Sequence, residues 1–214
     1  YVEPHKAREI IGRLPKHVTP VGVFVNEPAE NLLKMVDEWK LDLVQLHGDE
    51  SPRYCELISN HVNTVKAFRI GKDDNIAYKI HPYQDAVDLI LFDTMGQQFG
   101  GTGEKFDWNL LVKSTLSKPF FLSGGIAPDD TEEIRKFTTN NGKLFALDIN
   151  SKFEIAPGKK DMNKIKDYNS IIEASKFLNI SQSNIKAVLY NKQNNIKNIF
   201  HFISYFTSSI LMTL

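Results

Sequence analysis

Six short apolar runs alternate with segments of helical pattern along this chain, and this alternation constrains its fold more than any other feature. Between the runs, apolar residues recur at helical spacing, as in Leu32, Val36 and Trp39. Runs that are apolar along their whole length are typical of strands buried on both faces of a parallel sheet. Short connections favour right-handed crossovers between neighbouring parallel strands. The runs span residues 21–25, 41–48, 64–68, 87–93, 119–123 and 144–148.

The alternation predicts an α/β domain but fits two architectures, an open doubly wound sheet and a closed barrel. Periodicity does not distinguish them. Open sheets that bind dinucleotides have G-x-G-x-x-G after the first strand, and those that bind nucleoside triphosphates have G-x-x-x-x-G-K-[ST]. Neither pattern occurs at the expected place in this chain. The sequence therefore disfavours these two forms of the open sheet.

Composition limits the number of domains and the classes of partner. With 214 residues, of which 42% are apolar and 24% charged, the chain fits one domain better than two. Its 26 basic residues equal its 26 acidic residues, so we expect no nucleic-acid partner. The single cysteine, Cys55, excludes an internal disulfide and favours a cytoplasmic location. No cluster of His, Cys and carboxylate residues has metal-ligand spacing, so we expect no metal and no cofactor.

Two polar loops form a candidate phosphate site. Ser123, Gly124 and Gly125 follow the fifth run and precede a helical pattern, so their backbone amides are suited to face an anion. Asn150 and Ser151 follow the sixth run, and barrels bind phosphate on the loops of their last two strands. The alternative is a tight turn that needs glycine only for its backbone angles. If the glycines bind phosphate, Gly124→Val should weaken that binding and leave the thermal transition largely intact.

Asp93 and Asp148 each end an apolar run, and both are candidates for a general acid. Apolar surroundings raise the pKa of a carboxyl, as proton donation near neutral pH requires. Either aspartate could instead cap a helix or accept a hydrogen bond from a loop amide. The sequence does not rank the two. His47 follows the second strand at the same predicted edge and is a candidate acid, base or substrate donor, although a loop histidine is more often structural.

Two further features are interpreted as structural. The glycine-rich residues 100–103 lie in a long loop after Asp93, which suits a lid over a substrate, but a surface loop is the commoner role. Cys55 lies on the apolar side of a predicted helix, so we interpret it as a core residue and not as a nucleophile.

A set of motifs occurs in order along the chain. They are VGVFVN (21–26), VQLHGDE (44–50), LFDT (91–94), GGTGEKFDW (100–108), LSGGIAPDD (122–130) and ALDINSKFE (146–154) followed by PGKKD (157–161). Other phosphate-binding barrels share the SGG element but not the QLHG, GGTG-FDW and PGKKD elements together. From Tyr1 to about Phe177 the chain resembles the phosphoribosylanthranilate isomerase family.

This resemblance implies a (β/α)8 TIM barrel and a step of tryptophan biosynthesis, the Amadori rearrangement of N-(5-phosphoribosyl)anthranilate to 1-(2-carboxyphenylamino)-1-deoxyribulose 5-phosphate. The enzyme would be an aldose-ketose isomerase, an intramolecular oxidoreductase that acts on a small phosphorylated substrate without a cofactor. In the family, a general acid protonates the ribose ring oxygen, the ring opens to a Schiff base, and a general base removes the proton at C2. The resemblance assigns the acid to Asp93. It assigns phosphate binding to Gly124, Gly125, Asn150 and Ser151, a supporting role in the site to Asp148, and the rim of the site to His47.

The chain departs from the family pattern at its N-terminus. Family members begin with a strand bearing K-I-C-G, whose cysteine is the general base, and an arginine precedes the tyrosine that matches Tyr1. Only about six βα units are present here, and six strands do not close a barrel of eight. Cys55 lies in the wrong element to replace the base. We therefore expect residues 1–178 to form a partial barrel that is inactive by itself.

Residues 179–214 form an atypical C-terminal extension that matches no part of the family pattern. They are rich in asparagine, isoleucine and serine. The apolar residues 199–214 are shorter than the roughly 20 residues of a membrane span, so a packed helix or a tail from an altered reading frame is favoured over a membrane segment. Two alternatives for the whole chain remain open, namely another phosphosugar-binding barrel enzyme and a non-catalytic remnant.

Overall fold

The computed structural model describes residues 4–14, 18–95, 105–114, 116–140, 143–156, 159–165, 200–201 and 210–213. Six parallel strands lie side by side in chain order, with each strand paired to its neighbours in the sequence. They are β1 (Val21–Phe24), β2 (Leu43–Leu46), β3 (Asn63–Ile70), β4 (Leu89–Thr94), β5 (Phe120–Leu122) and β6 (Leu144–Ile149). Each of the six runs predicted from the sequence is a strand.

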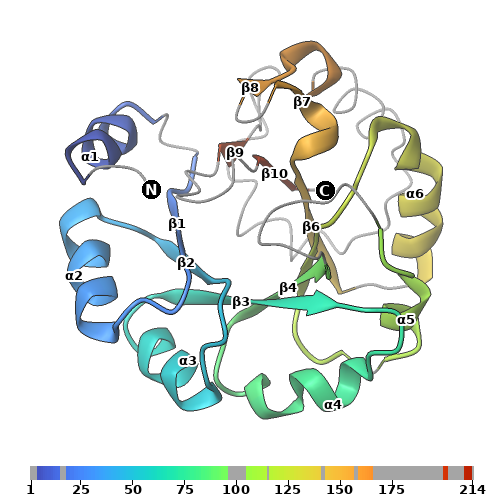
Figure 1. Ribbon diagram of the computed structural model, residues 1–214, viewed down its shortest axis with the longest axis horizontal. Helices are drawn as coiled ribbons and strands as arrows, with labels where there is room; N and C mark the ends of the chain where they lie inside the picture. The colour runs from blue at the N-terminus through green and yellow to red at the C-terminus, as the bar shows by residue number, and fades with distance from the viewer. Residues whose placement is uncertain are drawn as a thin grey trace.

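The helices follow one another around the outside of this curved sheet (Figure 1). An open doubly wound sheet reverses its strand order at a switch point, whereas the order β1 to β6 never reverses. The winding is therefore that of a barrel, which settles the choice that periodicity left open. The helices are α1 (Pro4–Gly12), α2 (Ala29–Trp39), α3 (Pro52–Ser59), α4 (Ile76–Ile80), α5 (Asn109–Val112) and α6 (Thr131–Asn140), with 3-10 turns η1 (His81–Tyr83), η2 (Pro128–Asp130) and η3 (Ser151–Phe153).

Local sequence explains where the helices begin and which face they bury. Helix α3 begins after Ser51, whose hydroxyl accepts a hydrogen bond from the Tyr54 amide, and Pro52 occupies its first turn. Its buried face carries Cys55, as predicted, together with Ile58. The pattern places these side chains against the sheet, because residues three apart lie on one helical face.

The apolar core has two parts, one on each face of the sheet. An inner cluster on the concave side contains Val65, Ala67, Leu91, Phe121 and Ala146. A larger outer cluster fills the space between the sheet and the helices and includes Phe68, Phe92 and Leu122. Since successive side chains of a strand point to opposite faces, the strands β3 to β6 supply residues to both clusters.

The described part of the C-terminal extension consists of two short strands. Strand β10 (Ile210–Thr213) pairs antiparallel with β6, and β9 (Phe200–His201) pairs antiparallel with β10, which extends the sheet beyond β6. The sequence favoured a packed helix within residues 199–214, and this expectation is wrong for residues 200–201 and 210–213, which form strands paired to the sheet. The other residues of 179–214 lie outside the described residues. A second small sheet joins β7 (Glu154–Ala156) to β8 (Lys159–Lys160). Among the helices that the structure describes, none is long and apolar enough to cross a bilayer.

Candidate active site

Asp93 and His47 meet at the carboxyl ends of β4 and β2. The His47 Nε2 atom lies 3.5 Å from Asp93 Oδ2, and the two side chains are 20% and 23% exposed. The other oxygen, Asp93 Oδ1, accepts a hydrogen bond of 2.9 Å from the Thr94 amide. The structure therefore brings together two of the predicted site residues and leaves both accessible to a ligand.

Asp148, at the end of β6, adds a second carboxyl to this group. Its Oδ2 accepts a hydrogen bond of 3.0 Å from the Ser123 hydroxyl, and its Oδ1 is buried with no partner in the described part of the chain. Burial, followed by the negative charge of Asp93, raises the pKa of Asp148 to about 6; the Ser123 hydrogen bond and the charges of His47 and Lys160 act in the opposite direction. Two interacting carboxyls retain a proton more readily than one isolated carboxyl, so this pair is suited to acid catalysis.

The glycine turn after β5 lies beside the end of β4. Gly124 has a φ of 88° and Gly125 a φ of 68°. Residues other than glycine rarely adopt these positive φ angles, because their Cβ atom clashes with the backbone. A Cβ on Gly124 would lie 2.2 Å from Thr94 Oγ1 and 2.7 Å from the Thr94 amide nitrogen. The expectation that Gly124→Val leaves the thermal transition intact is therefore wrong, because the backbone angle and the adjacent chain both exclude a side chain. The turn interpretation holds whether or not the amides bind phosphate.

Asn150 and Ser151 follow β6, the strand next to β5, so their loop lies at the same end of the sheet as the glycine turn. The Lys160 Nζ atom contacts Asn150 Oδ1 and lies 2.7 Å from Glu154 Oε1. Burial lowers the pKa of Lys160, and its carboxylate partners offset part of this effect. The sequence motif PGKKD contained this lysine, but only the fold shows that it supports the loop of Asn150.

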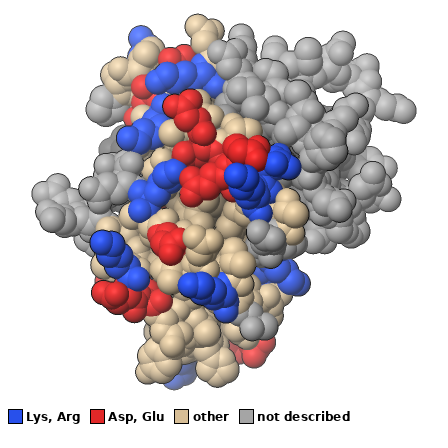
Figure 2. Space-filling view, turned by 90° about the vertical axis from the view of Figure 1, so that its right-hand side faces the viewer, with Lys and Arg blue, Asp and Glu red and all other residues tan. Residues whose placement is uncertain are grey.

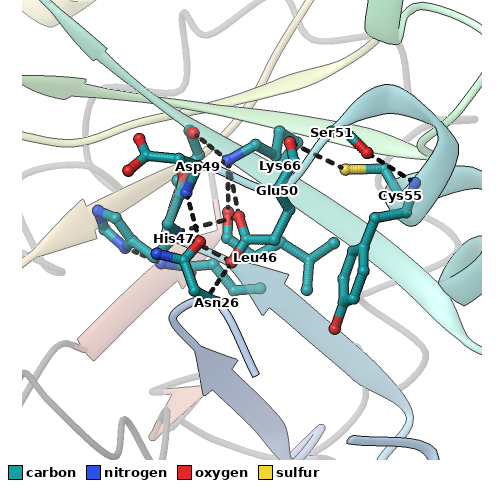
Figure 3. Close-up of polar contacts among 12 residues, drawn as sticks. Asn26, Leu46, His47, Asp49, Glu50, Ser51, Cys55 and Lys66 are labelled. Atoms are coloured by element: carbon teal, nitrogen blue, oxygen red, sulfur yellow. Dashed lines mark hydrogen bonds and ion pairs between the residues drawn. The ribbon is translucent and has the colours of Figure 1, made fainter. Parts of the chain in front are cut away.

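Behind His47, a buried ion pair holds the loop after β2 (Figure 3). Lys66 Nζ on β3 donates to Glu50 Oε2 at 3.0 Å and to the carbonyl oxygens of Leu46, Gly48 and Ala67. The Glu50 carboxylate also accepts hydrogen bonds from the amides of Asn26 and Gly48. The loop that carries His47 is thus fixed to β1 and β3 by buried polar contacts.

The sequence interpretation missed Lys66, Glu50 and Gln45 as contributors to the site. Lys66 and Gln45 are buried polar residues within otherwise apolar strands, and Gln45 contacts His47. A polar side chain inside an apolar strand must have a buried partner, since an unpaired one is unfavourable. The polar residues Lys66 and Gln45 within predicted strands therefore indicated buried polar contacts, but the sequence does not identify their partners.

Cys55 is fully buried in α3, and burial raises the pKa of its thiol to about 12. This confirms its interpretation as a core residue. The glycine-rich residues 100–103 lie outside the described residues. Lys105, which follows them, forms ion pairs with Asp130 and Glu133 of the η2–α6 segment. Figure 2 looks onto the side where α5 and α6 lie and shows acidic and basic side chains intermixed.

Comparisons with known proteins agree with these features. The family model described as "N-(5'phosphoribosyl)anthranilate (PRA) isomerase" matches residues 1–170. The N-(5'-phosphoribosyl)anthranilate isomerase of Parabacteroides distasonis is 41% identical over 149 residues, which are 69% of this chain and 66% of the relative. That of Petrotoga mobilis is 39% identical over 168 residues, which are 78% of this chain and 77% of the relative. The chain thus spans about two thirds to three quarters of the length of these curated relatives.

Solved structures show the same similarity. The crystal structure of phosphoribosyl anthranilate isomerase from Thermotoga maritima aligns with a TM-score of 0.70 and 34% identity, over 81% of this chain and 82% of that one. A second structure, of the isomerase in complex with reduced 1-(o-carboxyphenylamino)-1-deoxyribulose 5-phosphate, aligns with a TM-score of 0.66 and 31% identity over 81% of both chains.

Proposed function

The chain belongs to the phosphoribosylanthranilate isomerase family of TIM-barrel enzymes in tryptophan biosynthesis, and from this premise we propose that it provides the acid half of that isomerase reaction through Asp93. The substrate is N-(5-phosphoribosyl)anthranilate and the product is 1-(2-carboxyphenylamino)-1-deoxyribulose 5-phosphate. The observation that carries the proposal is the convergence of Asp93, His47 and Asp148 at the carboxyl ends of three barrel strands.

Asp93 acts as the general acid in this proposal. It donates its proton to the ribose ring oxygen while the bond between that oxygen and C1 breaks, and the lone pair of the anthranilate nitrogen forms the C=N bond of the Schiff base. A base then removes the proton at C2, which gives an enolamine that tautomerises to the ketose. Protonation of the leaving oxygen avoids an alkoxide, and such catalysis contributes about 100- to 10,000-fold.

Accessibility supports Asp93 over Asp148 as the proton donor. Asp93 is partly exposed, whereas the Asp148 side chain is buried and has one oxygen engaged by Ser123. A general acid must come within hydrogen-bond distance of the atom that it protonates. Asp148 is then a supporting residue, whose buried carboxyl lies close enough to Asp93 for the charge of Asp93 to contribute to its raised pKa.

We also propose that the substrate phosphate binds between the glycine turn and the loop after β6. Gly124 and Gly125 would supply backbone amides, and Asn150 and Ser151 polar groups. The support is that these two loops follow neighbouring strands at the end of the sheet where Asp93 lies, and that one solved relative is in complex with a phosphorylated compound. Lys160, which contacts Asn150, brings a positive charge close to this position.

The general base is a separate part of the proposal. In the family it is a cysteine on a strand that precedes the segment matched by this chain. Cys55 does not replace it, because the thiol is buried in α3 and its raised pKa leaves it protonated near neutral pH. We retain the expectations that residues 1–178 form a partial (β/α)8 barrel, that residues 179–214 are an atypical C-terminal extension, and that the protein is cytoplasmic.

The test is the loss of anthranilate fluorescence when phosphoribosylanthranilate is supplied. Two proteins are compared, residues 1–214 and a fusion in which the first strand, the first helix and the second strand of the Thermotoga maritima relative precede Tyr1, because the helix that follows that second strand is already present as α1. We expect turnover by the fusion and none by residues 1–214 alone, since only the fusion contains the family's base. Turnover by residues 1–214 would refute the requirement for that cysteine, and an inactive but folded fusion would refute the proposed function.

A further inference from the structure

Gln45 is the buried polar residue of β2 that the proposed mechanism does not use. Its side chain is only 6% exposed although it lies in the middle of the strand. Leu43 of the same strand packs against the inner apolar cluster, and side chains two residues apart share a face of a strand. Gln45 and His47 therefore both point to the concave side, where the site lies.

The amide of Gln45 contacts the histidine directly. Its nitrogen Nε2 lies 2.8 Å from His47 Nδ1, within hydrogen-bond distance. An amide NH2 group only donates, so in this arrangement Nδ1 accepts the hydrogen bond and carries no proton. The proton of the neutral imidazole is then on Nε2, the atom that faces Asp93 Oδ2 at 3.5 Å.

We infer that Gln45 is a positioning residue, which holds His47 in the Nε2–H tautomer and directs that N–H group toward Asp93. The inference rests on the proposed role of Asp93 as the general acid. When Asp93 gives its proton to the ribose oxygen, a carboxylate forms beside the Nε2–H donor. A donor that faces the ionised form stabilises it, so the correct tautomer promotes proton release.

The reverse tautomer would have the opposite effect. With Nδ1 protonated, the lone pair of Nε2 would face the newly formed carboxylate and repel it. Other charged groups near His47 do not fix the ring through Nδ1 in the contacts described. Asp93 of β4 faces Nε2, Asp148 of β6 interacts electrostatically, and Arg69 of β3 pairs with Asp49. Gln45 is the residue whose hydrogen bond selects the tautomer.

The first experiment observes the ring nitrogens by 15N NMR of histidine-labelled residues 1–214, with His47→Asn used to assign the signal. The spectra are recorded at a pH above which the His47 signals no longer change, so that the neutral ring is observed. We expect His47 to show a protonated Nε2 and an unprotonated Nδ1. His61 provides an internal reference, because its Nδ1 lies 2.9 Å from the Leu57 carbonyl oxygen and must donate there. A protonated Nδ1 on His47 would overturn the inference.

Two substitutions test whether Gln45 is responsible. Gln45→Met keeps the length of the side chain but removes the donor, so the His47 nitrogens should shift toward values averaged over both tautomers. Gln45→Glu keeps the shape but offers only an acceptor, which should favour a proton on Nδ1. An unchanged His47 spectrum in both variants would overturn the inference. If Gln45→Met does not fold, Gln45→Glu alone still decides between the outcomes.

The second experiment measures kinetics in the fusion protein described above. Gln45→Met should lower kcat by about tenfold to a hundredfold, part of the effect expected of acid catalysis, and change KM by less than about threefold. Gln45→Glu should also move the pH profile of kcat to higher pH, because the added carboxylate stabilises the imidazolium. Gln84→Met, at the end of η1 and outside the site, is the matched control and should leave kcat unchanged.

Each result has a distinct meaning. A purely structural role for Gln45 would lower the melting temperature without moving the pH profile or the nitrogen shifts, and this pattern would refute the inference. The NMR measurement needs no turnover. An inactive wild-type fusion would therefore refute the proposed function and still leave the tautomer of His47 measurable.

Discussion

Glu50 and Lys66 form an ion pair of 3.0 Å in which the two side chains are only 2% and 3% exposed. Lys66 comes from β3 and Glu50 from the loop after β2, and backbone groups satisfy their remaining hydrogen-bonding capacity. A buried pair of this kind is unfavourable to break, because the remaining charge has no water to solvate it. The pair fixes the loop that carries His47 and thereby connects packing to the site.

Lys66→Met is expected to reduce the free energy of unfolding by about 3 to 5 kcal/mol, since it leaves the Glu50 carboxylate buried and unpaired. Chemical denaturation monitored by circular dichroism measures this change. Lys34→Met is the matched control, because Lys34 is exposed and lies 3.9 Å from Glu38; its effect should stay within about 0.5 kcal/mol. Equal effects of the two substitutions would show that burial of the Lys66 pair does not stabilise the fold.

Asp93→Asn in the active fusion should lower kcat by about 100- to 10,000-fold while KM changes little, because the amide keeps the shape of the side chain but cannot donate the proton. Steady-state fluorescence kinetics provide both constants. Asp88→Asn is the control, because Asp88 directly precedes β4 at the end away from Asp93, where it accepts a hydrogen bond from the Thr64 amide; this variant should leave kcat unchanged. If Asp148→Asn abolished turnover and Asp93→Asn did not, the assignment of the general acid to Asp93 would be wrong.

Asp148→Asn should make the protein more stable above pH 6. In the folded protein the pKa of Asp148 is raised from 3.8 to about 6, so the folded state binds this proton more tightly than the unfolded state. The resulting stability is fully present below about pH 4 and is lost as the pH rises through 6, a change of about 3 kcal/mol. Urea denaturation between these pH values should show the loss in the wild type and not in the variant. A variant with the wild-type pH dependence would assign the effect to other groups.

Gly124→Ala should destabilise the protein by at least about 1 to 3 kcal/mol, the typical energy of a strained backbone conformation, with an added contribution from the contact with Thr94. Gly12→Ala is the control, because a Cβ at Gly12 meets nothing within 4 Å; it should be neutral or slightly stabilising. Thr94→Ala combined with Gly124→Ala should restore only part of the stability, since the amide nitrogen of Thr94 remains close. Calorimetric melting of the four proteins tests this, and an unchanged melting temperature for Gly124→Ala would contradict the observed turn geometry.

The sequence by itself determined the order of the strands and helices and the residue types at the strand ends. These properties are local, since hydrophobic periodicity and helix-capping residues act over a few neighbouring positions. The six runs therefore became strands, and Asp93, Asp148 and the glycine pair were recognised as candidates because each directly follows or ends an apolar run. The motif order identified the family for the same reason.

Only the tertiary structure decided which of these residues act on one another. The contact of Gln45 with His47 and of His47 with Asp93, the burial of Lys66 against Glu50, and the approach of Gly124 to Thr94 all depend on register and strand curvature. Most of these contacts join residues that are far apart in the chain. Hydrophobic periodicity shows which face of a strand a side chain occupies, but not which residue it contacts there. The pKa of Asp148 and the conformational restriction of Gly124 follow from this packing, because desolvation and steric exclusion arise only when the surrounding strands are in place.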